Sequence, residues 1–164
     1  MAQRKTAIIG IGNLILRDEG VGVHVVRELE GRELPLGVEV IDGGTATMDL
    51  LSAIYETERI IVIDALRAGG EPGTIYRCLP EDLMVAVDRP LSLHQVGFLD
   101  VLGIARQLGR NAYVVIIGVE PKEISWGMEL TPEVEATVPK VIEAVFKELK
   151  GLGYARIRNS PEPP

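Results

Sequence analysis

The sequence predicts an α/β protein, a three-layer α/β/α sandwich around a mostly parallel sheet of five strands. Two observations lead to this fold class. Short apolar runs rich in β-branched residues alternate along the chain with segments of helical periodicity, as in proteins built from βαβ units. Hydrophobic residues make up 46% of the chain and aromatic residues only 4%, so the core must be mainly aliphatic, as is typical of buried parallel strands.

The first half of the chain predicts two strand–helix pairs. Residues 6–12 form a strand buried on both faces, and residues 20–31 form a helix. That helix places its apolar side chains on one arc, which consists of Val21, Val25, Val26 and Leu29. A second strand, 38–44, stops at two glycines, and a helix over 46–56 follows it with Thr45 as the N-cap.

The second half predicts three further strands. Residues 59–66 and 111–121 are apolar runs typical of buried strands. Residues 73–79 also have strand character, but only a short link rich in glycine separates them from the strand before. Because a parallel neighbour needs a crossover of about a dozen residues, we expect this strand to be antiparallel or peripheral.

Two more helices complete the expected fold. One spans 94–109 and has Gly109 as its C-cap. The other spans 130–153. In this helix we expect Thr131 as the N-cap, Pro132 in the first turn, a kink at Pro139 and the end at Gly151.

Composition excludes several classes of function. The net charge is −7, and no stripe of basic residues with interleaved aromatics occurs, so nucleic acid is not an expected partner. The N-terminal apolar run is too short for a signal peptide, and no run is long enough to span a membrane. A single cysteine, Cys78, excludes an internal disulfide and favours the cytoplasm. We expect one domain over 1–153 and a flexible tail over 154–164.

The turn GIGNLILRDEG, at 10–20, raises the main functional question. Glycines between a strand and a helix can cradle a phosphate, but Ile15 stands where a dinucleotide fingerprint needs glycine, and no Walker sequence occurs. Asp18 and Glu19 would also repel a phosphate. A nucleotide-binding enzyme is therefore disfavoured, and the simplest alternative is that the glycines only allow a tight turn.

Carboxylates follow three of the predicted strands. Asp18 and Glu19 come after the first strand, Asp42 ends the second, and Asp64 lies inside the third. If these strands are parallel, the acids gather at one edge of the sheet, where such sheets bind ligands. Asp64 stands in an apolar run, where a charge is costly unless it is paired or bound to a cation. Each acid alone could be a cap or turn residue, Asp42 in particular, but together they favour a cation site.

The two histidines differ in their surroundings. His24 lies on the flank of the first predicted helix and is interpreted as a surface residue. His94 begins a helix after a loop and could be a cap, a surface residue or a ligand. Together with Glu19 and Asp64 it would supply one nitrogen and two oxygens, a donor set suited to Zn²⁺ or Ni²⁺. Nucleophilic catalysis has less support, because no G-x-S-x-G sequence occurs and Cys78 has no evident base.

Five segments form a more specific pattern, in the order GIGNLILRDEGVGVHVVREL, IDGGTATMDLL, IIVIDAL, LSLHQVGFLDVL and IIGVEPKEISWGMELTPEVEA. They resemble the hydrogenase maturation endopeptidases, proteases that trim the C-terminus of [NiFe]-hydrogenase large subunits. The resemblance covers about residues 6–150. It implies a single domain with a twisted five-stranded sheet of the phosphorylase/hydrolase-like type.

The resemblance also implies a metal site made by one Glu, one Asp and one His, which by motif are Glu19, Asp64 and His94. The metal would be nickel, already inserted in the precursor and serving as the recognition element, and zinc or cadmium could replace it in vitro. Whether the mechanism is of the metallo or the aspartic type stays open.

Substrate contacts are implied for a second stretch, namely Asp42, Gly43, Gly44 and Thr45. Asp42 is in addition a candidate catalytic residue, as a general base or as an orienting group. The segments 67–73 and 80–92 look like variable loops of the family and are expected to help select the precursor.

The leading hypothesis is a nickel-dependent endopeptidase that removes the C-terminal peptide of a [NiFe]-hydrogenase large-subunit precursor after nickel insertion. The alternative is a non-catalytic nickel-sensing or escort protein that docks on the same precursor without cutting it. In either case we expect a cytoplasmic monomer whose partner is the precursor, with no nucleic acid or membrane.

Overall fold

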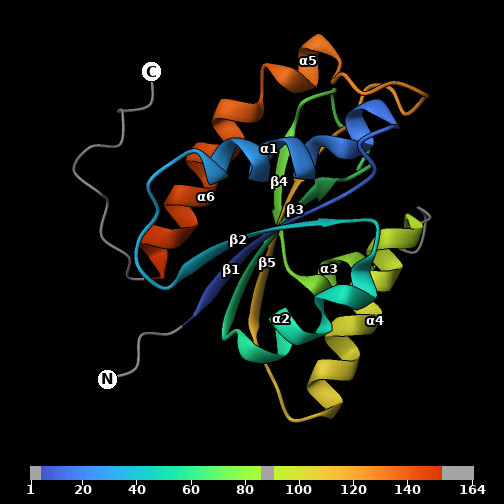
Figure 1. The fold of residues 1–164 in the computed structure, drawn as a ribbon. Coiled ribbons are helices and arrows are strands. Elements are labelled where there is room, and N and C mark those ends of the chain that lie inside the picture. The colour runs from blue at the N-terminus through green and yellow to red at the C-terminus, as the bar shows by residue number, and fades with distance from the viewer. Residues whose placement is uncertain (1–4, 86–90, 153–164) are drawn as a thin grey trace.

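A single five-stranded sheet runs through the computed structural model, which describes residues 5–85 and 91–152 (Figure 1). Its strands are β1 Thr6–Ile11, β2 Val38–Gly44, β3 Arg59–Ala65, β4 Ile75–Cys78 and β5 Tyr113–Val119. They lie in the order β2-β1-β3-β5-β4. Strand β4 runs antiparallel to β5 and the other pairs are parallel, which confirms the predicted, mostly parallel sheet.

Helices cover both faces of this sheet (Figure 1). They are α1 Val21–Glu30, α2 Leu51–Glu56, α3 Pro80–Val85, α4 Leu93–Gln107, α5 Pro132–Glu135 and α6 Val138–Gly151, with the 3₁₀ turns η1 Arg17–Gly20 and η2 Thr47–Leu50. Helices α1, α5 and α6 lie on one face, and α2, α3 and α4 lie on the other. The predicted three-layer α/β/α sandwich is confirmed.

The alternation of side chains along the strands produces the two halves of the core. In β1, Ile8 packs with α1 and α6, whereas Ile9 and Ile11 pack with α2 and α4 on the opposite face. All three are essentially fully buried, so the strand has no polar face. This explains why the strands are continuous apolar runs in the sequence.

The parallel register brings the carboxyl ends of four strands to one edge of the sheet. Gly10 of β1 pairs with Asp42 of β2, and Asp64 of β3 pairs with Gly118 of β5. This edge therefore carries the acids that the sequence singled out, with Asp42 and Asp64 near the ends of β2 and β3, and Asp18 and Glu19 in the turn η1 after β1. Within 5–85 and 91–152, no helix is long and apolar enough to cross a membrane.

The expected helix over 130–153 is in fact two helices. Helix α5 ends at Glu135 and α6 begins at Val138, so Pro139 lies in the first turn of α6, where its missing N–H has no helical partner to lose. The prediction of a kink inside one helix is wrong for this reason. Thr131 does occupy the N-cap of α5, but its side chain makes no capping bond.

Two other local predictions are corrected. Ala46, not Thr45, occupies the N-cap of the segment after β2, whose first turn is the 3₁₀ turn η2. Part of the segment 80–92, expected to be a loop, is the helix α3. The predicted tail, 154–164, and residues 86–90 lie outside the described residues.

Candidate active site

Helix α4 begins with a capping box that is fastened to the end of β3. The Ser92 hydroxyl accepts a hydrogen bond from Gln95 N (3.3 Å), and Ser92 N donates to Gln95 Oε1 (2.9 Å). Gln95 Nε2 in turn donates to the carbonyl of Ala65, the last residue of β3 (2.9 Å). This link sets the start of α4 against β3, so that His94 faces Asp64.

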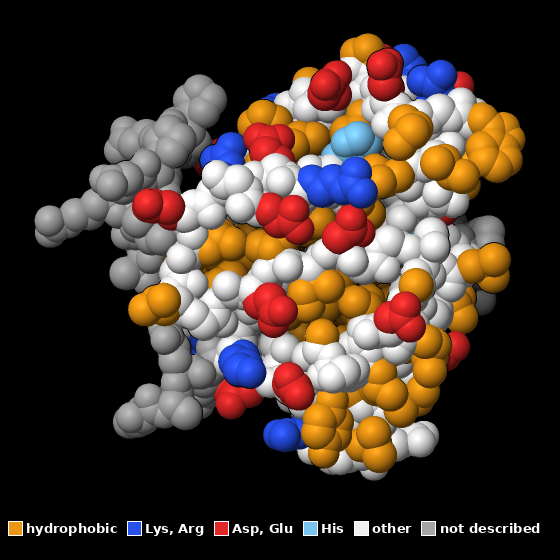
Figure 2. Space-filling model, in the orientation of Figure 1, with side chains coloured by type: hydrophobic (Ala, Val, Ile, Leu, Met, Phe, Trp, Pro, Cys, Tyr) orange, Lys and Arg blue, Asp and Glu red, His pale blue; other side chains and the backbone are white. Residues whose placement is uncertain are grey.

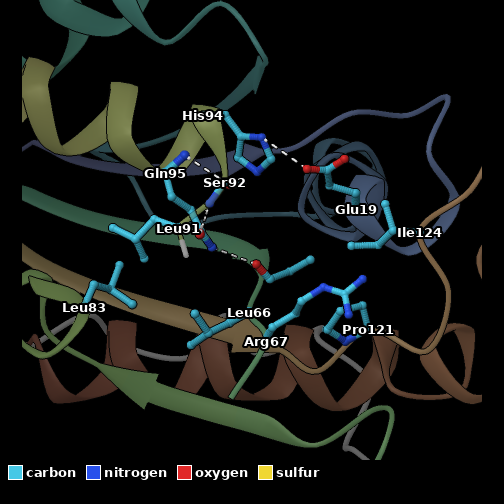
Figure 3. Close-up of a pocket in the computed structure, with 11 residues that line it drawn as sticks. Glu19, Leu66, Arg67, Leu83, Leu91, Ser92, His94, Gln95, Pro121 and Ile124 are labelled. Atoms are coloured by element: carbon cyan, nitrogen blue, oxygen red, sulfur yellow. Dashed lines mark hydrogen bonds and ion pairs between the residues drawn. The ribbon is translucent and has the colours of Figure 1, made fainter. Parts of the chain in front are cut away.

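His94 stands between two carboxylates. Its Nε2 lies 3.2 Å from Asp64 Oδ1, and its Nδ1 lies 3.6 Å from Glu19 Oε1, the second contact being visible in Figure 3. Asp64 is 2% exposed and His94 is 7% exposed. The structure therefore brings together the three residues that the sequence proposed as ligands, from η1, β3 and α4.

Burial and charge act in opposite directions on this group. Burial raises the pKa of Asp64 above its usual value, although the neighbouring His94 and Gln95 side chains oppose the rise. Burial lowers the pKa of His94, but the hydrogen bond with Asp64 and the charges of Asp64 and Glu19 outweigh it and raise that pKa overall. The pair therefore holds its proton firmly, and a charged His94 can balance the two acids.

One buried oxygen of this group is unpaired. Asp64 Oδ1 accepts from Ala65 N (2.8 Å) and from His94, but Oδ2 is buried and has no hydrogen-bond partner among the described residues. Buried carboxylate oxygens normally find a donor, so an unpaired one at a functional edge favours a ligand. The donor set of Glu19, Asp64 and His94 thus suits a cation.

The described residues do not, however, contain three His, Cys, Asp or Glu side chains arranged as a ready-made metal site. The arrangement of His94 explains this, because one ring nitrogen faces each carboxylate and the three donors do not converge on one point. A metal could be held only after the imidazole breaks one of these contacts.

The glycine turn after β1 serves to deliver Glu19. Gly12 has a φ of +138°, which is unfavourable for residues with a side chain, and a Cβ there would clash with the carbonyl oxygen of Glu19. The backbone of η1 can therefore approach the end of β1 closely. The glycines therefore allow a tight turn, as the simplest alternative proposed, and this turn places Glu19 beside His94.

Asp18, next to Glu19, has a different role. It is fully buried, and its two oxygens accept hydrogen bonds from Lys122 N (2.9 Å), Glu123 N (3.0 Å) and Thr131 N (2.8 Å). The Thr131 hydroxyl donates to it as well (2.8 Å), which is why this side chain does not cap α5. Asp18 therefore fixes the loop 120–131 against η1.

A cleft of about 230 Å³ opens beside His94 and Glu19 (Figure 3). Its lining is largely apolar and includes Leu66, Leu83, Leu91, Pro121 and Ile124. Arg67 also lines the cleft and extends toward Pro121 in the close-up, and it has no hydrogen bond or ion pair with any described residue. An apolar cleft with one free cation suits an extended peptide that carries apolar side chains.

The stretch from Asp42 to Thr45 does not line this cleft. Asp42 Oδ1 accepts from Gly44 N (3.1 Å), and Oδ2 is paired with Arg27 Nε (3.4 Å) at the surface. In this structure Asp42 is thus a turn residue with an ion-pair partner. Its catalytic role and the substrate contacts of Gly43, Gly44 and Thr45 stay predictions.

Two contributors to the site went unnoticed in the sequence. The spacing Ser92-x-x-Gln95 is itself a capping-box signal and could have indicated that Gln95 fixes the helix start. Nothing local could have indicated that the Gln95 side-chain amide reaches the carbonyl of Ala65, or that Arg67 lines the cleft without a partner among the described residues.

Comparisons with known proteins show the family to which the chain belongs. A family model described as hydrogenase maturation protease matches residues 23–148. The hydrogenase 2 maturation protease of Escherichia coli K12 is 35% identical over 153 residues, which cover 92% of this chain and 93% of that protein.

Solved structures give the same result. The hydrogenase maturating endopeptidase HybD from E. coli has a TM-score of 0.84 and 35% identity, with 92% of this chain and 94% of that chain covered. The [NiFe] hydrogenase maturation protease HybD from Thermococcus kodakarensis has a TM-score of 0.74 and 31% identity over 88% of this chain and 98% of that chain. This chain belongs to the hydrogenase maturation protease family.

Proposed function

We propose that this protein is a nickel-dependent endopeptidase that removes the C-terminal peptide of a [NiFe]-hydrogenase large-subunit precursor after nickel insertion. The observation that carries the proposal is the position of His94 between Glu19 and Asp64 at the mouth of an apolar cleft. The protein works as a cytoplasmic monomer, and the precursor is its partner.

Nickel belongs to the substrate in this proposal. Glu19, Asp64 and one nitrogen of His94 would hold it, and the unpaired Oδ2 of Asp64 is the oxygen most ready to do so. Bound there, the ion would supply Lewis acidity to a water or to a peptide carbonyl. Because an imidazole that holds a metal must be neutral, His94 would have to release its proton and one of its carboxylate partners.

The remaining groups bind and orient the substrate. Gln95 keeps His94 in line with Asp64 through its bond to Ala65. Arg67 and the apolar walls of the cleft receive the peptide beside the scissile bond. Asp42 could act as a base only if it first leaves Arg27.

The test is direct. Purified protein is incubated with nickel-loaded precursor, and precursor mass is followed by mass spectrometry. We expect loss of a C-terminal peptide with wild type, no loss from nickel-free precursor, and no loss with Glu19→Gln, Asp64→Asn or His94→Ala. Glu39→Gln, an exposed acid on β2, is the matched control and should process normally. An intact precursor in a stable complex with the wild-type protein would instead establish the escort function.

A further inference from the structure

Three large apolar side chains are exposed beside the candidate active site. In the loop between β5 and α5, Trp126 is 78% exposed and Met128 is 62% exposed, and on the turn after β1, Ile15 is 45% exposed. We call these residues the apolar tip. Figure 2 shows hydrophobic side chains gathered at the upper right of the molecule, where Figure 1 places this loop. Single exposed apolar residues are ordinary, but a group next to a cleft marks an interaction site.

The backbone of the apolar tip is fixed before any partner arrives. Gly127 N donates to the Ile15 carbonyl (3.0 Å), and Arg17 N donates to the Gly127 carbonyl (2.8 Å), so the two segments run side by side. The Arg17 guanidinium packs so closely on Gly127 that a Cβ there would lie 3.0 Å from Arg17 Cζ. Gly127 has a φ of +155° and Arg17 one of +49°, an unfavourable conformation for a residue with a side chain. A preorganised surface of this kind loses little entropy on binding.

The apolar tip is continuous with the cleft. The loop that carries Trp126 and Met128 also supplies Pro121 and Ile124 to the cleft wall. The same loop is held by the Asp18 carboxylate, which directly precedes Glu19. A protein whose chain end enters the cleft must therefore lie against the tip. Aromatic residues and Met are enriched in the buried centres of such interfaces.

We propose that the apolar tip is the docking surface for the folded body of the hydrogenase precursor, against which an apolar patch of the precursor packs while its C-terminal peptide occupies the cleft. This inference rests on the proposed function. It assigns substrate affinity to the tip, and it leaves the chemistry to Glu19, Asp64 and His94.

Kinetics with nickel-loaded precursor test this assignment. Trp126→Ala combined with Met128→Ala should raise KM by at least about tenfold, as expected for the loss of interface anchors, while kcat changes less than about twofold. Leu36→Ala is the matched control, because Leu36 is 81% exposed but precedes β2 and so lies at the opposite edge of the sheet. If wild type processes the precursor and the double variant has an unchanged KM, the docking surface is wrong. If wild type does not process it, the proposed function fails instead.

Fluorine NMR of Trp126 provides a second test of the proposal. Trp126 is the only tryptophan in the chain, so incorporation of 5-fluorotryptophan gives a single ¹⁹F resonance. With unlabelled precursor in excess and turnover in progress, that resonance should shift as Trp126 leaves water. A resonance that stays at its free position during turnover would overturn the proposal.

Discussion

Asp18 and Asp64 are two buried carboxylates at the same edge of the sheet, and they differ in how their charges are satisfied. Asp18 is 0% exposed, and both of its oxygens accept hydrogen bonds, three of them from backbone N–H groups. Asp64 is 2% exposed, and its Oδ1 contacts Ala65 N and His94, but its Oδ2 has no donor within residues 5–85 and 91–152.

The difference separates a structural acid, Asp18, from the acid that we propose to be functional, Asp64. The donors around Asp18 replace the water that the carboxylate lost on burial, and the energy gained ties a distant loop to η1. Asp64 lacks that replacement, which is why burial raises its pKa and why an oxygen remains for a ligand. Burial of an acid alone therefore does not indicate a site, whereas burial with an unpaired oxygen beside a histidine favours one.

The largest expected effect comes from removing each of the two acids by mutation and comparing the losses of stability and activity. Asp18→Ala leaves three N–H groups without their acceptor, so we expect a loss of about 3 kcal/mol or more in the free energy of unfolding and a Tm lower by roughly 10 °C. Asp64→Asn removes a poorly solvated charge, and His94 can release its proton in response, so we expect a smaller loss of stability than in Asp18→Ala but no precursor processing. Urea unfolding and the processing assay measure both.

Two results would contradict this prediction. Equal losses of stability in Asp18→Ala and Asp64→Asn would mean that the unpaired oxygen of Asp64 has no functional meaning. Full processing by Asp64→Asn would remove Asp64 from the site. Either result would break the distinction between the two acids.

A second prediction concerns the residue that orients the functional acid and its histidine. Gln95→Leu removes the bond to Ala65 O and the bond from Ser92 N, so the ring of His94 is no longer held toward Asp64. Processing should fall roughly 10- to 100-fold, the usual effect of losing a partner behind a ligand. The fall should be in kcat, with KM for the precursor nearly unchanged.

Ser92→Ala is the control for this prediction. It removes only the cap of α4, at a cost of about 1 kcal/mol in stability, and it keeps the Gln95–Ala65 bond. We expect nearly full processing. If Ser92→Ala lowers kcat as much as Gln95→Leu does, then Gln95 acts through helix stability and not by positioning His94.

The sequence predicted the part of this molecule that depends on local patterns. The apolar runs defined the strands, and the parallel topology sufficed to bring Glu19 and Asp64 to one edge of the sheet. Local patterns selected Glu19 as the candidate ligand but could not show that Asp18 ties a loop to η1, because the partners of Asp18 lie more than 100 residues away, Thr131 being 113 residues further on. Pro139 was misplaced for a similar reason, since only the structure shows where α6 begins.

The smallest expected effect concerns a third buried acid. It tests whether a buried acid whose two oxygens both accept hydrogen bonds has a structural role. Glu120 is 7% exposed and accepts hydrogen bonds from Ala68 N (2.7 Å), Gly69 N (3.3 Å) and the Tyr76 hydroxyl (2.9 Å). By this criterion it is structural, like Asp18.

Glu120→Gln keeps one acceptor oxygen and should cost about 1 kcal/mol in unfolding free energy. Because these bonds hold the backbone just after Arg67, KM should also rise a few-fold while kcat is kept. Arg67→Ala should give the same rise in KM without the loss of stability. A lower kcat in Glu120→Gln would place this acid with Asp64 and show that satisfied hydrogen bonds do not exclude a functional role.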